Sequence, residues 1–318
     1  MFGRVKKKIF ASNMLFKGKN KKVKIGLALG GGGARGFAHL GAIKAFEEYG
    51  LKFDYVCGTS AGSIVGAFYS AGYNYSQMFK VASKMDVKDI RTSKIVFVPS
   101  KSDGIEKVIK DELGDINIED LPIPFSAVAV DIISMEECVI TKGNLAKACA
   151  GSCAVPGIFQ PVVFGDRHLC DGGLQNTIPA DVPKLMGCDY VVAVDVNKSR
   201  NYGTESTKLL DVLSCTIRIL MKGNVVKGYL YGDIMIKPET KRFKSTKKEG
   251  FLDMIEEGYK ATIDAIPEIM KLFKRKPIKL KTKVKYLNED RVVIWKNYHS
   301  CGTHFANTKF RLNECNFF

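Results

Sequence analysis

The sequence has little of what marks membrane-spanning, secreted or low-complexity chains. No apolar run approaches the roughly 18 residues that a transmembrane helix needs. The basic start at residues 4–8 precedes a short apolar stretch that polar residues interrupt, without a clean cleavage site, which argues against a secretory signal. The 9 cysteines are odd in number and scattered, so no disulfide framework is expected. A length of 318 residues with 46% hydrophobic composition predicts a globular, cytoplasmic protein with free, mostly buried thiols.

Acidic residues are missing from the N-terminus and scarce near the C-terminus, although the formal net charge of the chain is +16. Residues 1–24 contain nine Lys or Arg and no acid, and residues 271–318 contain twelve against three, so the middle of the chain is nearly neutral. Basic ends suit either a solvated tail or contact with an anionic surface at the inner face of the membrane. No aromatic-rich basic sheet or recognition-helix pattern accompanies them, so nucleic acid is not expected as a partner.

Between the basic ends, strand-like and helix-like segments alternate, which predicts an α/β fold. We expect one catalytic domain over 23–275, a basic segment over 1–22 and a basic tail over 276–318. The alternating apolar and basic residues that begin this tail suit an edge strand or a disordered segment. Strands are predicted at 23–29, 55–57, 125–130, 137–140, 167–170, 190–194 and 233–236, helices at 37–50, 64–72, most of 74–120, 145–149, 207–222 and 251–275, and an irregular segment at 151–161.

Two glycine-bearing turns carry most of the functional information. Residues 30–36 read Gly-Gly-Gly-Gly-Ala-Arg-Gly, and residues 58–62 read Gly-Thr-Ser-Ala-Gly. Each follows an apolar run and opens a helical pattern, so each is a strand-to-helix turn whose backbone N–H groups point outward. The second has the Gly-x-Ser-x-Gly spacing of a nucleophile elbow, in which small neighbours let the chain present Ser60 at the tip. A loop that can hold an oxyanion beside such a serine predicts acyl transfer.

A serine hydroxyl needs a base, and histidine, the usual one, occurs only 4 times. Two histidines lie in the C-terminal tail, and His39 lies on the helix after the glycine loop, where we expect a structural role. His168 is an odd number of residues from Asp171, which in a strand puts the two side chains on opposite faces. Asp171 itself ends a short strand before two glycines that allow close approach, although an Asx turn is the plainer explanation of that pattern.

In chain order, these motifs resemble the patatin-like phospholipase family. The glycine loop, the serine turn, Pro156-x-x-Phe159 and Asp171-Gly172-Gly173 follow one another over roughly residues 23–200. The resemblance implies a three-layer α/β/α fold with a central, mainly parallel sheet. It implies a serine acyl hydrolase that cleaves fatty acyl esters of phospholipids or related lipids through an acyl-enzyme, with no metal or cofactor.

The resemblance also implies roles for particular residues. Ser60 is the expected nucleophile and Asp171 the expected base, acting without histidine and made more basic by burial. Arg35 is expected either to add positive potential or to bind loop carbonyls, and Pro156 and Phe159 to line the approach to the site, although core packing explains Phe159 equally well. The expected oxyanion segment comprises Gly31, Gly32, Gly33, Ala34, Arg35 and Ala61, and the motif glycines are Gly36, Gly58, Gly62, Gly172 and Gly173.

Two alternatives come from other functional classes. The first turn also fits the Gly-x-Gly-x-x-Gly fingerprint of a dinucleotide-binding oxidoreductase, but that site needs an acid after the second strand, and Asp54 precedes it. The other alternative is a catalytically silent lipid-binding or regulatory protein on the same fold. The presence of both Ser60 and Asp171 counts against it.

Overall fold

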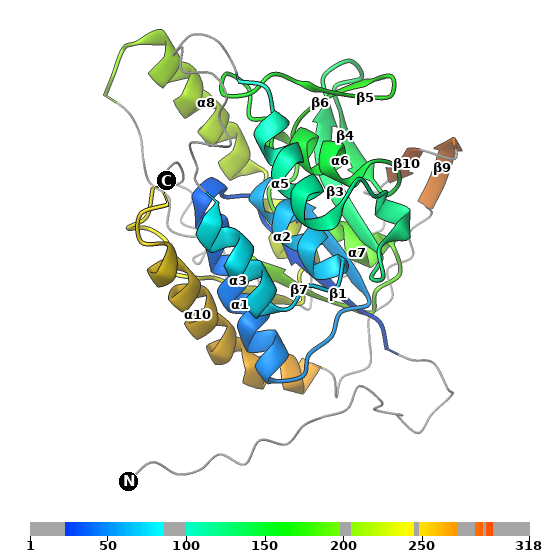
Figure 1. The fold of residues 1–318 in the computed structure, drawn as a ribbon, viewed down its shortest axis with the longest axis vertical. Helices are drawn as coiled ribbons and strands as arrows, with labels where there is room; N and C mark the ends of the chain where they lie inside the picture. Colours follow the sequence, from blue (N-terminus) through cyan, green and yellow to red (C-terminus); the bar gives the residue numbers. More distant parts are fainter. Residues whose placement is uncertain are drawn as a thin grey trace, which may run out of the picture.

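The computed structural model describes residues 23–85, 100–197, 205–244, 248–272, 284–288 and 291–294. The strands of the main sheet are β1 (Ile25–Leu29), β2 (Tyr55–Thr59), β3 (Phe125–Asp131), β4 (Glu136–Ile140), β5 (Val162–Phe164), β6 (Arg167–Asp171), β7 (Tyr190–Val194) and β8 (Ile234–Ile236). They form an 8-stranded sheet in the order β5-β6-β3-β2-β1-β7-β8, and β4 also pairs with β3 (Figure 1). From β3 to β8 the neighbours run parallel, whereas β4 and β6 pair antiparallel with β3.

Helices cover both faces of this sheet and produce three layers, as the sequence predicts. Along β1, Leu27 and Leu29 join the larger core, while Ala28 packs on the other face with Ile178 and Val191. The helices are α1 (Phe37–Glu48), α2 (Ala61–Ser70), α3 (Tyr75–Lys84), α5 (Asp103–Leu113), α6 (Leu145–Ser152), α7 (Asp181–Leu185), α8 (Leu209–Gly223), α9 (Val226–Tyr231) and α10 (Phe251–Leu272). The larger core lies under α1, α2, α3, α5, α6 and α10, and α7 and α9 lie on the other side.

Most predicted elements are present, with differences at short ones. The strand β5 and the helices α7 and α9 are short elements that periodicity did not indicate, and α6 runs three residues further than predicted, into the expected irregular segment. Three short 3-10 helices also occur, η1 (Gly33–Gly36), η2 (Ile118–Asp120) and η3 (Gly172–Leu174). In the predicted basic tail, β9 (Val284–Asn288) and β10 (Arg291–Ile294) form a separate antiparallel pair. The predicted N-terminal segment over 1–22 lies outside the described residues.

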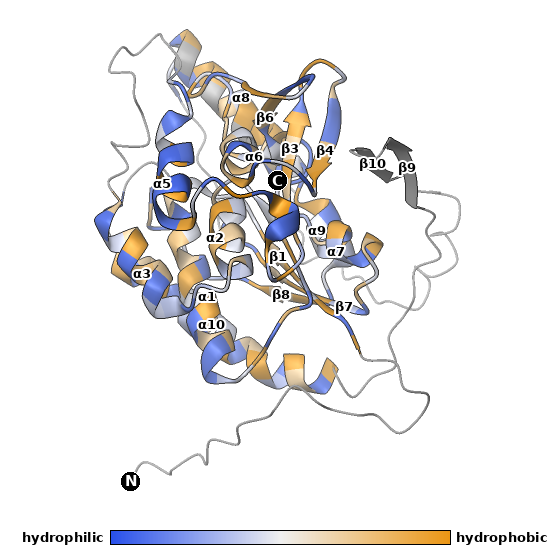
Figure 2. Cartoon of the chain, turned by 45° about the vertical axis from the view of Figure 1, so that its right-hand side comes forward, coloured by the Kyte–Doolittle hydropathy of each residue, from blue (hydrophilic) through white to orange (hydrophobic). Residues whose placement is uncertain are grey.

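The cysteines in the described part of the chain agree with the prediction of free thiols. Seven are free, and six of these are buried, the exception being Cys215 on α8. Within the ranges given above, none of the helices combines the length and the hydrophobicity needed to cross a lipid bilayer. The hydropathy of the elements, drawn in Figure 2, shows orange strands enclosed by helices that carry blue segments.

The packing of α1 against α10 depends on two glycines that let the helix backbones touch. A Cβ atom at Gly41 would overlap the carbonyl oxygen of Ile255, and one at Gly258 would overlap the carbonyl oxygen of Ala38. Neither neighbour is a flexible side chain that can move aside. This crossing fixes α1, whose N-terminus follows directly from the glycine loop.

We expect Gly258→Ala to lower the free energy of unfolding by about 3 kcal/mol, because overfilling a packed contact forces the helices apart. Urea unfolding of both variants provides the measurement. Gly223→Ala is the matched control, since a Cβ there meets no atom within 4 Å and alanine favours a helix. Equal stability of Gly258→Ala and the wild type would contradict the close approach of α1 and α10.

Candidate active site

Ser60 occupies a strained turn between β2 and α2. Its φ is +52°, a left-handed conformation that is rare for residues other than glycine. The surrounding groups hold it there: its N–H donates to Ser152 Oγ at 2.8 Å, and its carbonyl accepts from the N–H and from Oγ of Ser63, each at 2.7 Å. The backbone is therefore fixed on both sides of the serine, as a nucleophile elbow requires.

The two glycines of this turn are explained by close backbone approach. A Cβ at Gly62 would overlap the carbonyl oxygen of Leu29, at the end of β1. A Cβ at Gly58 would overlap the carbonyl oxygen of Gly62. The turn is thus packed against the end of β1, directly beside the glycine loop, and a Cβ at Gly31 would lie 3.2 Å from the Cβ of Ser60.

Strand register brings Asp171 to Ser60. Thr59, the last residue of β2, pairs with Val128 of β3, and β3 continues for three more residues. The antiparallel β6 pairs with this projecting end and finishes with Asp171 opposite Ala129. Because β4 pairs with the opposite edge of β3, β2 and β6 meet end to end along one edge of this strand, and Ser60 and Asp171 leave their strands beside each other there. The carboxylate does end a strand, as the sequence predicts, but that strand is antiparallel to its neighbour.

The carboxyl group of Asp171 is fully buried, and burial raises its pKa to about 6. The Ser60 hydroxyl and the Gly173 N–H, which donates to Oδ1 at 2.8 Å, act in the opposite direction. In the described structure, Oδ2 accepts no hydrogen bond of ordinary geometry. A carboxylate with a raised pKa and a free oxygen next to a serine hydroxyl is suited to take a proton.

Ser152 is a site residue that the sequence did not reveal. Its hydroxyl accepts from the Ser60 N–H and donates to the Val128 carbonyl at 2.5 Å, so it links the nucleophile turn to β3. The residue ends α6, in a stretch that the sequence analysis took as irregular from 151. A single serine at a helix end is common and forms no motif, so no sequence pattern indicates the hydrogen bond from Ser60 to Ser152.

The glycine loop offers fewer backbone donors than the sequence predicts. The N–H of Gly31 donates to the Thr177 carbonyl at 3.0 Å, and the N–H of Arg35 donates to the Gly32 carbonyl at 3.3 Å. The first N–H is engaged by a residue outside the loop and the second by a residue within it, which removes Gly31 and Arg35 from the expected backbone donors for an oxyanion. In the described part of the chain, no hydrogen bond engages the N–H groups of Gly32, Gly33, Ala34 and Ala61.

Arg35 and His39 stabilise the glycine loop through hydrogen bonds. Arg35 is buried, and its guanidinium donates to the Phe243 carbonyl at 2.8 Å and to Asn197 Oδ1 at 3.1 Å. Asn197 in turn donates to the Gly31 carbonyl, so the arginine holds the loop through a side chain. His39 Nε2 lies 2.8 Å from the Gly30 carbonyl, and burial lowers the pKa of the imidazole to about 4. A neutral histidine that donates to a carbonyl is a structural group, as predicted.

The remaining sequence candidates differ in burial and position. His168 is exposed while Asp171 is buried, which confirms that they face opposite sides of β6. Phe159 packs in the main core, and Pro156 is half-buried. Asp54 precedes β2 and accepts the Ile25 N–H at 2.9 Å, at the opposite end of the strand from the glycine loop. An acid at that end does not complete a dinucleotide site.

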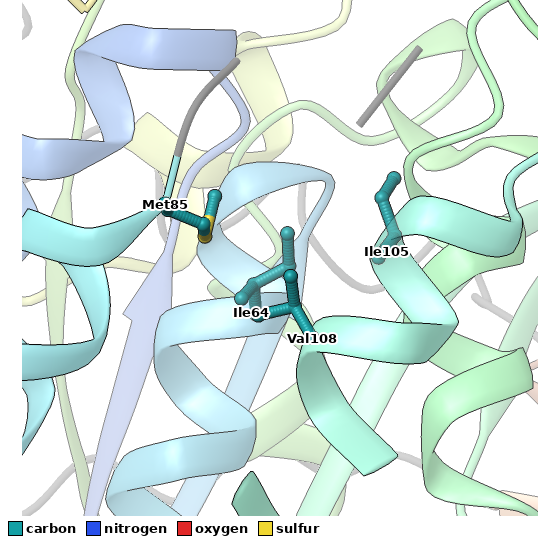
Figure 3. Close-up of a pocket in the computed structure, with 4 residues that line it drawn as sticks. All are labelled: Ile64, Met85, Ile105 and Val108. Carbon is teal, nitrogen blue, oxygen red and sulfur yellow. The ribbon is translucent and has the colours of Figure 1, made fainter. Parts of the chain in front are cut away.

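A small apolar pocket opens close to the nucleophile turn. It holds about 190 Å³ of space, part of it open to solvent, and is lined by Ile64, Met85, Ile105 and Val108 (Figure 3). Ile64 lies one helical turn after Ser60 on α2, and its N–H donates to the Ser60 carbonyl at 3.4 Å. Among the described residues, the lining contains only hydrocarbon and thioether groups, so it favours an apolar chain.

Sequence comparison finds relatives that are named as an esterase and a lysophospholipase. The chain is 35% identical over 195 residues to Neuropathy target esterase sws of Drosophila melanogaster, covering 57% of this chain and 14% of that protein. It is 36% identical over 179 residues to Lysophospholipase NTE1 of Eremothecium gossypii, covering 54% and 12%. The match thus spans only a small part of these relatives.

Among solved structures, VipD from Legionella pneumophila has a similar fold, with a TM-score of 0.53 at 15% identity, covering 78% of this chain and 67% of that one. The family model of the patatin-like phospholipases matches residues 27–184. This match begins in β1, ends in α7 and contains both turns and the Asp-Gly-Gly segment. The chain belongs to the patatin-like phospholipase family.

Proposed function

We propose that the chain hydrolyses fatty acyl esters of phospholipids or related lipids through a Ser60-Asp171 dyad. The observation that carries the proposal is the buried carboxyl of Asp171, whose Oδ2 accepts no ordinary hydrogen bond and whose pKa the Ser60 hydroxyl lowers. The pKa of about 6 leaves the group mostly ionised at neutral pH and a better base than an exposed aspartate. The names of the relatives, an esterase and a lysophospholipase, support the same class of substrate.

In the proposed reaction, Ser60 Oγ attacks the ester carbonyl carbon while its proton moves to Asp171 Oδ2. Collapse of the tetrahedral intermediate breaks the ester C–O bond, and the protonated carboxyl returns its proton to the leaving alcohol. A water molecule, deprotonated by Asp171, then attacks the acyl carbon, the bond from this carbon to Ser60 Oγ breaks to release the fatty acid, and Asp171 returns the proton to Ser60 Oγ. Both half-reactions use the same two side chains and need no further reactant than water.

The negative charge on the carbonyl oxygen is proposed to be held by free N–H groups near Ser60. Gly32, Gly33 and Ala34 belong to the loop beside the nucleophile, and Ala61 follows it at the start of α2. The start of a helix also favours an anion through its dipole. Loss of one such donor typically raises the barrier by about 2.7–4 kcal/mol.

The substrate is proposed to place an acyl chain against the apolar pocket of Ile64, Met85, Ile105 and Val108. Since its first lining residue is one turn from Ser60, a bound chain can leave its ester near the hydroxyl. We propose a cytoplasmic protein that works at the membrane surface, where the basic termini add attraction to anionic lipids of about 1 kcal/mol for each nearby Lys or Arg.

We expect a fluorophosphonate probe to label the wild type and not Ser60→Ala, because the probe forms a covalent bond with an activated serine hydroxyl. Fluorescence of the protein band in a denaturing gel measures this. The control is Ser70→Ala on the same helix, which removes a buried hydroxyl that has no hydrogen-bond partner in the described part of the chain and should label as the wild type does. Labelling of Ser60→Ala at the wild-type rate would sink the assignment of the nucleophile.

We expect kcat/KM for a short-chain ester to fall as the pH drops below about 6, where Asp171 takes up a proton.

Asp171→Asn should lose turnover yet gain stability at neutral pH. Because the pKa of Asp171 is higher in the folded state than its unfolded value of 3.8, protonation of the carboxyl stabilises the fold below pH 3.8, and this stabilisation is lost as the pH rises through 6. Asp171→Asn should therefore raise the free energy of unfolding by ~3 kcal/mol above that pH and should leave it unchanged below pH 4. Thermal unfolding across this range measures the difference.

Asp131→Asn is the matched control for stability. Burial alone would raise the pKa of Asp131, but hydrogen bonds from Ile133, Ser134 and His168 together lower it. Its contribution is therefore present above the unfolded pKa and is lost in acid, so this variant should be less stable than the wild type at neutral pH. If Asp171→Asn also destabilised the protein at neutral pH, the carboxyl of Asp171 would not carry the burial cost described above.

We expect Ser152→Ala to lower kcat about 10- to 100-fold with little change in KM, because the Ser60 N–H then has no acceptor and the elbow loses one of its supports. Steady-state kinetics on a soluble ester separate the two constants. Ser152→Thr, which keeps the hydroxyl, should recover most of the rate. An Ala variant with wild-type kcat would show that the Ser152 bridge does not position the nucleophile.

A further inference from the structure

Helix α8 turns an apolar stripe toward solvent. Its exposed residues recur at intervals of three, four and seven, which places them on one side of the helix. An amphipathic helix normally buries such a stripe, but here the side chains are 42–71% exposed. Near the C-terminal end of α8, Met221 packs over Gly173 of η3. The stripe consists of Leu209, Val212, Leu213, Ile219 and Leu220.

A second exposed apolar group lies in the turn between β3 and β4. Ile132, Ile133 and Met135 are 46%, 60% and 77% exposed. Met135 has a φ of +58°, and among the described residues only Ser60 shares a positive φ without being glycine. A hairpin turn of polar residues or glycine would avoid both the strain and the exposure. The turn thus holds a large apolar side chain outward at a conformational cost.

Both groups adjoin the turn that carries the catalytic aspartate. Asn224, which follows α8, donates to the Leu174 carbonyl at 2.6 Å, and Gln175 donates to the Met135 carbonyl at 2.9 Å. Leu174 and Gln175 follow directly after Asp171-Gly172-Gly173. Figures 1 and 2 both place α8 and the β3–β4 turn at the upper end of the molecule, and Figure 2 shows orange segments on each.

We propose that the α8 stripe and the β3–β4 turn form one docking surface that inserts into the interface of a lipid bilayer. The inference rests on the proposed lipid substrate, since a bilayer is then the source of that substrate and the surface borders the site. Charge agrees: residues 205–248 contain ten Lys or Arg against four Asp or Glu, and Lys208 and Lys222 lie at the two ends of α8. Basic groups around an apolar stripe suit anionic headgroups, whereas a second copy of the same basic helix would be repelled.

The test is flotation of the full chain with vesicles of equimolar phosphatidylcholine and phosphatidylglycerol. The Leu213→Glu/Ile219→Glu variant and the Met135→Glu variant should each bind at least ~10-fold more weakly than the wild type, since each places a charge in the bilayer interface. The matched control is Leu252→Glu on α10, where the leucine is 58% exposed outside this surface, and it should bind as the wild type does. At high salt, the attraction between the basic segments and the anionic lipids is screened, so the flotation that persists reports the apolar contribution to vesicle binding.

The outcomes separate this surface from the proposed function. All variants should hydrolyse a water-soluble short-chain ester at the wild-type rate; if the wild type hydrolyses none, the proposed function fails whatever the flotation shows. Vesicle binding that the α8 and Met135 substitutions leave unchanged, or a wild type that does not float, would overturn the docking surface. A wild type that sediments as a dimer, with the α8 variant monomeric and vesicle binding intact, would assign the stripe to a second copy of the chain instead.

Discussion

The pairing of β6 with the projecting end of β3 is the constraint on which the site depends. Because β3 continues beyond the last pair that it makes with β2, it offers three residues to an antiparallel partner. That partner ends where the serine turn begins, so Ser60 and Asp171 are fixed relative to each other through a single strand. The Ser152 hydroxyl strengthens this arrangement by joining the Ser60 N–H to the Val128 carbonyl of that same strand.

Several groups at the site are energetically unfavourable by themselves, and the surrounding hydrogen bonds and packing stabilise them. Ser60 has a left-handed backbone, Asp171 is a carboxyl without contact with water, and Arg35 is a buried cation. Hydrogen bonds from Ser63, Gly173 and Asn197 fix these groups or the loop beside them. Behind the loop, α1 and α10 pack backbone to backbone, which gives the glycine loop a rigid helix to lead into. Strain and an unpaired carboxylate oxygen persist only where packing determines the position of each group.

Apolar surfaces lie near both the serine turn and the aspartate turn. The apolar pocket of α2 and α5 lies on one side of the serine turn, and the exposed apolar residues of α8 and the β3–β4 turn border the aspartate turn. Under the proposed function, these apolar surfaces would be the ones that a lipid substrate contacts near Ser60 and Asp171.

Local sequence determined the parts of this protein that depend on neighbouring residues. The strand-turn-helix units, the buried strand at 190–194 and the two glycine turns follow from periodicity and residue size, and Ser60 follows from its spacing between glycines. Asp171 is indicated only by the family resemblance of its Asp-Gly-Gly motif, because a carboxylate before Gly-Gly by itself has several ordinary explanations. Tertiary structure alone decided that β6 is antiparallel, that Ser152 supports the elbow, and that the N–H of Gly31 is engaged. Those features join residues up to 146 positions apart in sequence, as in the Gly31 to Thr177 bond, and hydrogen bonds across such distances leave no local pattern in a sequence.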